Sequence, residues 1–110
     1  MISYDQFKTI ELRVGEILSA ERVPETDKLL KLSVNFGEET PRQIISGIAA
    51  YFPDLAELVG VKCAFVTNLE PRVIRGLESQ GMIMAVGGSD GLPFSLLRVS
   101  PEAVPGSPVK

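Results

Sequence analysis

Apolar and polar residues alternate along the first half of the chain with a period of two, which is the pattern of β-strands that bury one face. The clearest stretch is LLKLSVNF, residues 29–36. Its polar residues, Lys31 among them, fall on the face opposite four apolar ones: Leu30, Leu32, Val34 and Phe36. We therefore predict a strand here, with Lys31 on its outer surface.

Two neighbouring stretches show the same period. In LRVGEILSAERV, residues 12–23, the predicted apolar face holds Leu12, Val14 and Leu18. Gly15 lies inside that stretch, and a glycine within a strand predicts a bulge or a sharp bend. In RQIISGI, residues 42–48, Ile44 and Ser46 lie opposite Ile45.

The second half of the chain predicts further strands separated by turns. VKCAFVTNL, residues 61–69, is apolar on both faces, so we expect a central strand or one covered on two sides. GMIMAV, residues 81–86, predicts a fifth strand, GGSDG a turn after it, and FSLLRV, residues 94–99, a last strand. The Pro- and Gly-rich tail from residue 100 either wraps the domain as extended chain or frays.

Two short helices are expected as well. Ser3 and Gln6 have the spacing of a capping box, which predicts a helix over Tyr4 to Lys8. YFPDLAELVG, residues 51–60, places Pro53 at a helix start and Gly60 at its end.

Five or six short strands with one helix between the third and fourth fit a small Greek-key barrel of the OB type. We predict a single all-β OB-fold domain over residues 1–110, which is the length of one compact domain. Its expected parts are five barrel strands, a short helix between strands three and four, a short N-terminal helix and an extended C-terminal tail.

The titratable residues narrow the possible chemistry. The chain has no histidine and one cysteine, so neither a Ser-His-Asp nor a Cys-His mechanism fits within it. No Cys/His cluster exists to hold zinc, and no cofactor motif is present, so we expect no enzyme, no metal and no cofactor. Cys63 lies in an apolar run and is predicted to be a small buried residue.

The same composition predicts a cytoplasmic protein. A lone cysteine suits a reducing compartment, and no apolar run approaches the roughly 20 residues that span a bilayer. We expect no membrane partner. The net charge of −3 is unlike the basic excess of most nucleic-acid-binding proteins, although a local basic patch can persist in an acidic chain.

One stretch, NLEPRVIRGLESQGM at residues 68–82, gathers the candidate chemistry. Arg72 and Arg75 are predicted to project from an irregular segment, where their planar groups suit phosphate oxygens. Asn68, Ser79 and Gln80 have the donors and acceptors to read base edges or sugar hydroxyls, and Met82 offers an apolar contact to a base. From the residues alone, the stretch is either such a binding element or a charged surface connector.

Five motifs together resemble a known family: FKTIELRVGEI, DKLLKLSVNFG, RQIISGIA, NLEPRVIRG and ESQGMIMA. They resemble the tRNA-binding domain of methionyl-tRNA synthetase C-termini, of the phenylalanyl-tRNA synthetase beta chain, of endothelial-monocyte-activating polypeptide and of small free-standing bacterial tRNA-binding proteins. The motifs span Phe7 to Ala85. The resemblance implies an OB fold that binds tRNA by shape with little sequence preference, and a homodimer in the free-standing and methionyl forms.

The resemblance also implies which residues bind RNA. Five candidates come from the NLxPRxxRGxxSxGM pattern, and three more are expected to share one face with them. These candidates are Asn68, Arg72, Arg75, Ser79 and Met82, with Lys31, Arg42 and Ser46. Arg13 matches the LRVG motif, but we expect it to form a structural ion pair.

The predicted function is therefore non-catalytic tRNA binding by a homodimeric module, free-standing or at the C-terminus of a methionyl-tRNA synthetase. Val73 stands where the family often has a basic residue, and with the acidic total it predicts weak to moderate, steeply salt-dependent binding. The alternative is an export-related chaperone that holds unfolded polypeptide in a dimer groove. A pure dimerisation module is a third reading.

Overall fold

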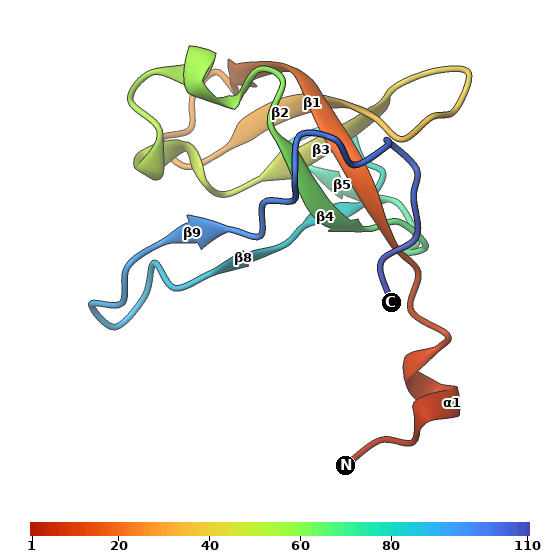
Figure 1. Ribbon diagram of the computed structural model, residues 1–110. Coiled ribbons are helices and arrows are strands. Elements are labelled where there is room, and N and C mark those ends of the chain that lie inside the picture. Colours follow the sequence, from red (N-terminus) through yellow and green to blue (C-terminus); the bar gives the residue numbers. More distant parts are fainter.

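Five antiparallel strands wind into a nearly closed barrel in the order β3-β2-β1-β4-β7 (Figure 1). The computed structural model describes residues 1–110. The barrel strands are β1 (Leu12–Arg22), β2 (Leu30–Asn35), β3 (Arg42–Ser46), β4 (Lys62–Val66) and β7 (Met82–Ile83). This arrangement confirms the predicted all-β OB-type fold with five barrel strands.

Two small hairpins leave the barrel. One joins β5 (Arg72–Ile74) to β6 (Leu77–Ser79), and the other joins β8 (Ala85–Val86) to β9 (Ser95–Leu96). The predicted fifth strand, residues 81–86, is therefore divided, because its first part pairs with β4 and its second part with β9. GGSDG forms part of the loop at the tip of the second hairpin, as predicted.

The N-terminal helix α1 covers Tyr4–Phe7, one residue less than predicted. Its capping box is present: Ser3 Oγ accepts from the Gln6 amide at 3.1 Å, and the Ser3 amide donates to Gln6 Oε1 at 2.8 Å. The structure holds no helix long and apolar enough to cross a membrane.

The predicted helix between the third and fourth strands is in place but has another form. Two 3₁₀ turns, η1 (Ala49–Tyr51) and η2 (Leu55–Leu58), replace one α-helix. Pieces this short commonly close with the tighter i→i+3 hydrogen bonds. Asp54 caps the second turn through a 3.0 Å bond from the Ala56 amide.

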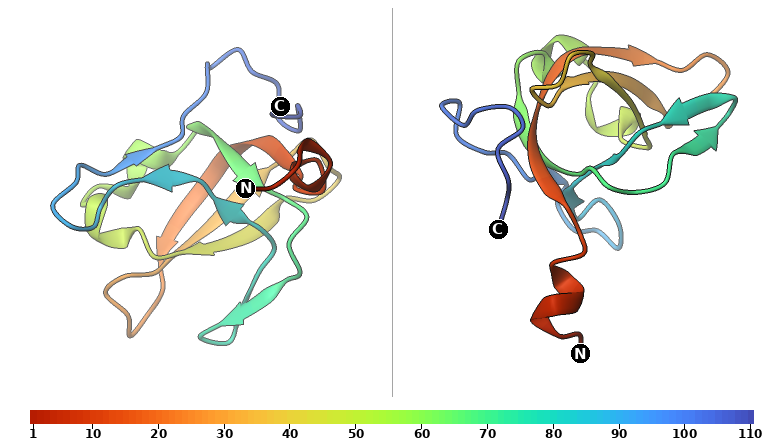
Figure 2. Two further views of the ribbon diagram at one scale, coloured as in Figure 1. Left: turned by 90° about the horizontal axis from the view of Figure 1, so that it is seen from below. Right: turned by 90° about the vertical axis from the view of Figure 1, so that its right-hand side faces the viewer.

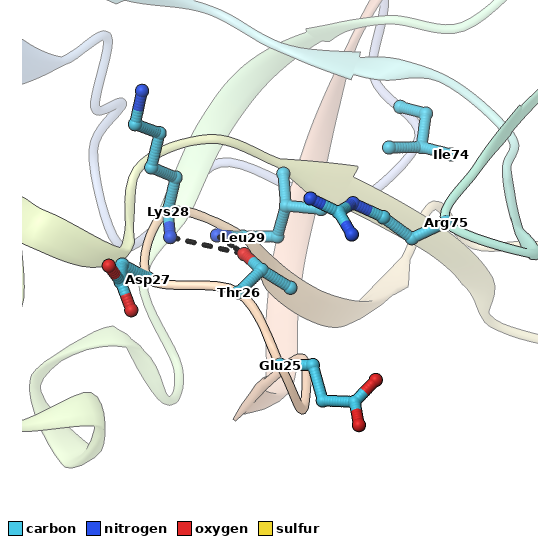
Figure 3. Close-up of a pocket in the computed structure, with 7 residues that line it drawn as sticks. All are labelled: Glu25, Thr26, Asp27, Lys28, Leu29, Ile74 and Arg75. Atoms are coloured by element: carbon cyan, nitrogen blue, oxygen red, sulfur yellow. Dashed lines mark hydrogen bonds between the residues drawn. The ribbon is translucent and has the colours of Figure 1, made fainter.

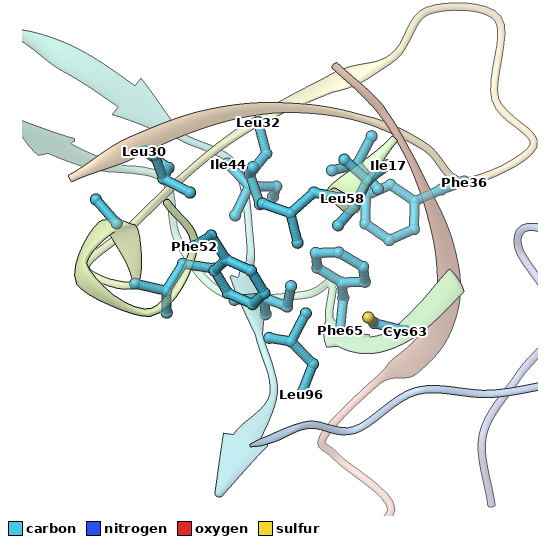
Figure 4. Packing of buried hydrophobic residues seen from close by; sticks show 14 residues of the cluster. Ile17, Leu30, Leu32, Phe36, Ile44, Phe52, Leu58, Cys63, Phe65 and Leu96 are labelled. Carbon is cyan, nitrogen blue, oxygen red and sulfur yellow. The ribbon is translucent and has the colours of Figure 1, made fainter. Parts of the chain in front are cut away.

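The barrel interior is filled by large apolar side chains (Figure 4). Leu30, Leu32, Val34 and Phe36 are all buried, which confirms the predicted inward face of the second strand. Phe36 packs edge-to-face on Phe65 of β4, with ring centroids 5.1 Å apart. The contact joins the residue that directly follows β2 to β4.

The prediction for the first strand chose the wrong face. Gly15 pairs with Cys63 of the core and an added Cβ there would meet Phe36, whereas Val14 pairs with Ala64, outside the core cluster. Leu18 is 42% exposed, whereas its neighbour Ile17 is completely buried. The register of β1 against β2 shifts between Ile17 and Ser19, and after this irregularity the even-numbered Ala20 packs against the core. The shift does not lie at Gly15, where the core side chains approach the backbone instead.

β4 is the central strand that its apolar sequence predicted, because it pairs with β1 on one side and β7 on the other. Cys63 is completely buried, as predicted. Burial raises the pKa of its thiol to about 11, against a smaller opposing effect of Arg98. The thiol is therefore protonated at neutral pH and serves as a core group.

The C-terminal tail wraps the barrel and runs beside β1 (Figure 1). The Gly106 amide donates to the Val14 carbonyl at 2.8 Å, and the Val14 amide donates to the Ser107 carbonyl at 2.9 Å. A further bond joins the Val109 amide to the Leu12 carbonyl at 2.8 Å. Of the two predicted forms of the tail, the wrapped one is confirmed.

Candidate nucleic-acid interface

Residues 68–82 contain a regular β-hairpin, which corrects the prediction of an irregular segment. β5 and β6 pair in register up to Ile74 and Leu77, and only Arg75 and Gly76 lie between them. Both turn residues have positive φ, 52° and 78°, as a two-residue type I′ turn requires. The hairpin projects from the barrel (Figure 2), so its tip is open to a large partner.

Arg75 at the tip faces a hollow of about 500 Å³ between the hairpin and the β1–β2 loop (Figure 3). The hollow contains two cations, two acids and a hydroxyl, and is lined by Glu25, Thr26, Asp27, Lys28, Leu29, Ile74 and Arg75. Lys28 is a candidate that the sequence analysis missed. Its place in the β1–β2 loop was the available signal, since this loop flanks the ligand face of OB folds.

Arg72 lies at a second, smaller hollow on the same hairpin. Its strand partner is Ser79, and the hollow of about 70 Å³ also holds Ile45, Leu69 and Met82. Neither Arg72 nor Arg75 forms an ion pair or a side-chain hydrogen bond within the chain. Both guanidinium groups are therefore free to bind an external anion.

Asn68 has a different position from these arginines. Its Oδ1 accepts from the Glu11 amide at 2.8 Å, and its Nδ2 donates to the Thr9 carbonyl at 2.7 Å. Both ends of the side-chain amide thus bind the backbone that precedes β1. The structure gives Asn68 a fastening role at the start of the hairpin segment.

Ser79 is also engaged inside the protein and is 5% exposed. Its Oγ accepts from the Ile45 amide at 2.9 Å and donates to the Gly81 carbonyl at 3.1 Å. One residue on, the Gln80 side chain accepts from the Gln43 amide at 2.9 Å. The side chains of Ser79 and Gln80 therefore accept hydrogen bonds from backbone amides along the free edge of β3, where no further strand pairs.

The remaining candidates are divided between two faces. Lys31 is on the outer surface of β2, pairs with Glu21 at 3.5 Å and shares a hollow of about 340 Å³ with Arg42. Ser46 pairs with Leu30 of the inward face, so it points to the side opposite Lys31. The expectation that Lys31 and Ser46 share a face is therefore wrong, because they occupy positions of opposite parity in the β2–β3 ladder.

Arg42 and Arg13 meet at one carboxylate, that of Glu38. Arg42 Nε donates to Glu38 Oε1 and Arg42 Nη2 donates to Glu38 Oε2, both at 2.9 Å. Arg13 Nη2 lies 3.1 Å from Oε2. The pKa of the Glu38 carboxyl lies below its ordinary value of 4.5, and the hydrogen bond from Arg42 is the largest cause. Burial acts to raise this pKa, and Arg13 lowers it further. The predicted ion pair of Arg13 is present, with Glu38 and with Glu11 at 3.1 Å.

This cluster predicts a loss of stability in acid. Because the folded-state pKa of Glu38 is depressed, its stabilising effect is complete above the unfolded-state value and disappears as pH falls through the folded-state value. We expect the melting temperature of the wild type to fall more steeply below about pH 4.5 than that of Glu38→Gln. Calorimetry from pH 6 to pH 3 measures the two melting temperatures. An equal fall of melting temperature with pH in the two proteins would contradict the prediction.

Known proteins resemble this chain in sequence. The family model described as "Putative tRNA binding domain" matches residues 12–108. Methionine–tRNA ligase of Chloroherpeton thalassium is 48% identical over 111 residues, covering 99% of this chain and 15% of the ligase. The corresponding enzyme of Enterococcus faecalis is 46% identical over 90 residues, covering 82% of this chain and 14% of the ligase. The chain thus spans about 15% of the length of the curated relatives it matches.

Solved structures agree with this relationship. A MetRS-related protein from Pyrococcus horikoshii superposes with a TM-score of 0.91 and 39% identity, covering 100% of this chain and 98% of that one. The chaperone CsaA of Bacillus anthracis superposes with a TM-score of 0.85 and 24% identity, covering 100% and 99%. The second match is a likeness of fold.

Proposed function

Since the chain belongs to the tRNA-binding domain family, we propose that it binds tRNA through the β5–β6 hairpin and catalyses no reaction itself. The observation that carries the proposal is the pair of free guanidinium groups, Arg72 and Arg75, on a projecting hairpin whose base is fastened to the barrel. A guanidinium group presents a planar fork of donors that matches phosphate oxygens. With tRNA as its ligand, the domain is proposed to act in the cytoplasm.

Recognition of this kind follows the shape of the RNA backbone. Phosphate contacts position a protein on a nucleic acid without reading its sequence. Lys28 lies across the hollow from Arg75 and adds a second cation there. We assign Met82, which is half exposed beside Arg72, an apolar contact to an unpaired base, and Lys31 a weaker charge contact on the outer face of β2.

A homodimer is part of the proposal, and its support is the N-terminal segment. α1 stands away from the barrel (Figures 1 and 2), and none of its residues is buried. Tyr4, Phe7 and Ile10 are apolar side chains exposed along this segment, at 73%, 40% and 44%. A second copy that covers them would also duplicate Arg72 and Arg75, because a two-fold axis repeats the same surface.

We expect sedimentation of the wild type at micromolar concentration to give the mass of a dimer. Replacing both Tyr4 and Phe7 with serine removes apolar surface from the proposed contact and is expected to give a folded monomer. Leu92→Ser is the control, since Leu92 is 61% exposed on the β8–β9 loop. A monomeric wild type would refute the dimer, and a dimeric double variant would refute its placement at α1.

The function itself is tested by titrating tRNA and an unfolded polypeptide side by side at two salt concentrations. If several phosphates are contacted, raising salt from about 50 to 200 mM should weaken tRNA binding by a factor of about ten or more. The exposed apolar residues Leu69, Val73 and Met82 on and beside the hairpin are what favour the alternative, a polypeptide-binding chaperone. Tight peptide binding with a flat salt response would replace the tRNA proposal with that alternative.

The domain is proposed to act either alone or within a synthetase chain. In a synthetase, a non-catalytic module that holds the outside of the tRNA raises the local concentration of the substrate near the active site. The same contacts in a free-standing dimer cradle the folded tRNA.

A further inference from the structure

Arg42 joins the two ends of the hairpin segment. Its Nη1 donates to the Thr67 carbonyl at 2.7 Å and to the Gln80 carbonyl at 3.2 Å. Thr67 directly precedes the 68–79 segment, and Gln80 directly follows it. A single nitrogen therefore holds together the two points at which the hairpin segment leaves and re-enters the barrel.

Glu38 orients this arginine from the other side. Its two oxygens bind Arg42 Nε and Nη2 in a bidentate pair, each at 2.9 Å. Arg13 approaches the same carboxylate and also lies 3.3 Å from Thr67 Oγ1. Both guanidinium groups lie over the ring of Phe36, 5.4 Å and 5.8 Å from its centroid, so the cluster rests on the core.

We propose that Glu38 and Arg42 are positioning residues that set the angle at which the β5–β6 hairpin leaves the barrel, and thereby where Arg72 and Arg75 meet the RNA backbone. The inference rests on the proposed tRNA function. Four of the five N–H donors of Arg42 are occupied by these bonds, and its side chain is 22% exposed. Little of the group remains for a phosphate, so Arg42 acts through the hairpin.

The hairpin needs such support because it is small. β5 and β6 have three residues each, and an isolated two-stranded hairpin is marginally stable in water. The bonds at its base therefore decide its direction. A shift of the tip moves both arginines together relative to any fixed array of phosphates.

The two possible roles of Arg42 predict opposite results for Glu38→Gln. If Arg42 contacts phosphate, removing the acid frees a cation and lowers the repulsion of RNA, so binding becomes tighter. If Arg42 positions the hairpin, losing its orienting partner weakens binding although the protein has become less acidic. Glu39→Gln is a matched control, because Glu39 is the next residue, is exposed and forms no ion pair.

The experiment compares tRNA affinity of the wild type, Glu38→Gln, Glu39→Gln, Arg72→Ala/Arg75→Ala and the triple variant with Glu38→Gln. We expect Glu38→Gln to bind about tenfold more weakly than Glu39→Gln, and to add nothing further in the absence of Arg72 and Arg75. Binding by Glu38→Gln that equals or exceeds Glu39→Gln, or full additivity in the triple variant, overturns the positioning role. If Arg72→Ala/Arg75→Ala binds like the wild type, the tRNA proposal itself fails.

A second measurement separates positioning from general stability. Backbone ¹⁵N relaxation of residues 72–77 should show more motion in Glu38→Gln than in Glu39→Gln, while β1 to β4 remain unchanged. An unchanged hairpin overturns the proposal. Should Glu38→Gln fail to fold, Arg42→Lys keeps the charge but lacks the bidentate fork. Because both roles of Arg42 predict weaker binding for this variant, the test is then hairpin motion together with additivity: unchanged motion, or full additivity with Arg72→Ala/Arg75→Ala, overturns the proposal.

Discussion

Replacing Arg72 and Arg75 together with alanine is expected to weaken tRNA binding about a hundredfold. Hydrogen bonds to charged groups contribute about 1.5–3 kcal/mol each, so losing one strong contact from each arginine removes about 3 kcal/mol. The fold should not change, because neither side chain bonds to the rest of the protein. Arg75 has a φ of 52°, and alanine has the same Cβ, so the backbone strain of the turn is also unchanged.

A filter-binding titration at low salt measures the effect, and a second double variant controls for net charge. Arg98→Ala with Lys110→Ala removes the same two charges from residues outside the hairpin, where Arg98 lies beside Cys63 of β4. Loss of two charges away from the binding surface should weaken tRNA binding by less than about threefold. If both double variants weaken binding equally, the hairpin has no special role and the RNA follows the overall charge of the domain.

The barrel could be predicted from the sequence where a single rule decides the structure. The alternation from Leu30 to Phe36 fixes the inward face of β2, since shifting a strand by one residue would expose all of its apolar side chains. The same rule fails for β1, because its even positions carry apolar residues although its core face holds Gly15 and Ile17. What makes Gly15 a core position is its pairing with Cys63 of β4, far along the chain. The prediction of one continuous strand over residues 81–86 is wrong for the same reason, because the two strands with which its halves pair are set by the fold.

The arginines of the candidate site could be singled out from the sequence, but the roles of its polar residues could not. Asn68 and Ser79 were expected to face RNA, yet their side chains bind backbone groups at residues 9, 11 and 45. A motif preserves which side chains are present without showing whether they point outward. Within NLEPRVIRGLESQGM, the structure separates fastening residues from projecting ones, and whether Arg72 and Arg75 bind RNA stays a prediction.

The hairpin turn itself was missed because its sequence is atypical. Two-residue turns are usually marked by Asn-Gly or Asp-Gly, whereas here Arg75 precedes Gly76. An arginine in the left-handed region is uncommon, and such residues cluster where function demands a particular side-chain direction. This position directs the guanidinium group of Arg75 toward the hollow opposite Lys28 (Figure 3).

A large loss of stability is expected from Gly15→Ala. An added Cβ would lie 2.6 Å from side-chain atoms of Phe36 and of Val34 and 2.8 Å from Phe65, which is closer than such atoms approach in proteins. These three side chains are buried and held by the barrel, so they have little room to move. Overpacking a core costs about 1–3 kcal/mol, and three simultaneous clashes place this variant near 3 kcal/mol.

Thermal unfolding followed by circular dichroism should therefore show a melting temperature about 15 °C lower for Gly15→Ala than for the wild type. Gly47→Ala is the matched control, because no atom lies within 4 Å of its Cβ position and its φ is not positive. That variant should keep or slightly raise the wild-type stability by restricting the unfolded chain. Equal melting temperatures for the two variants would mean that the barrel expands readily at Gly15. In that case the close approach of β1 to the core would not require glycine at this position.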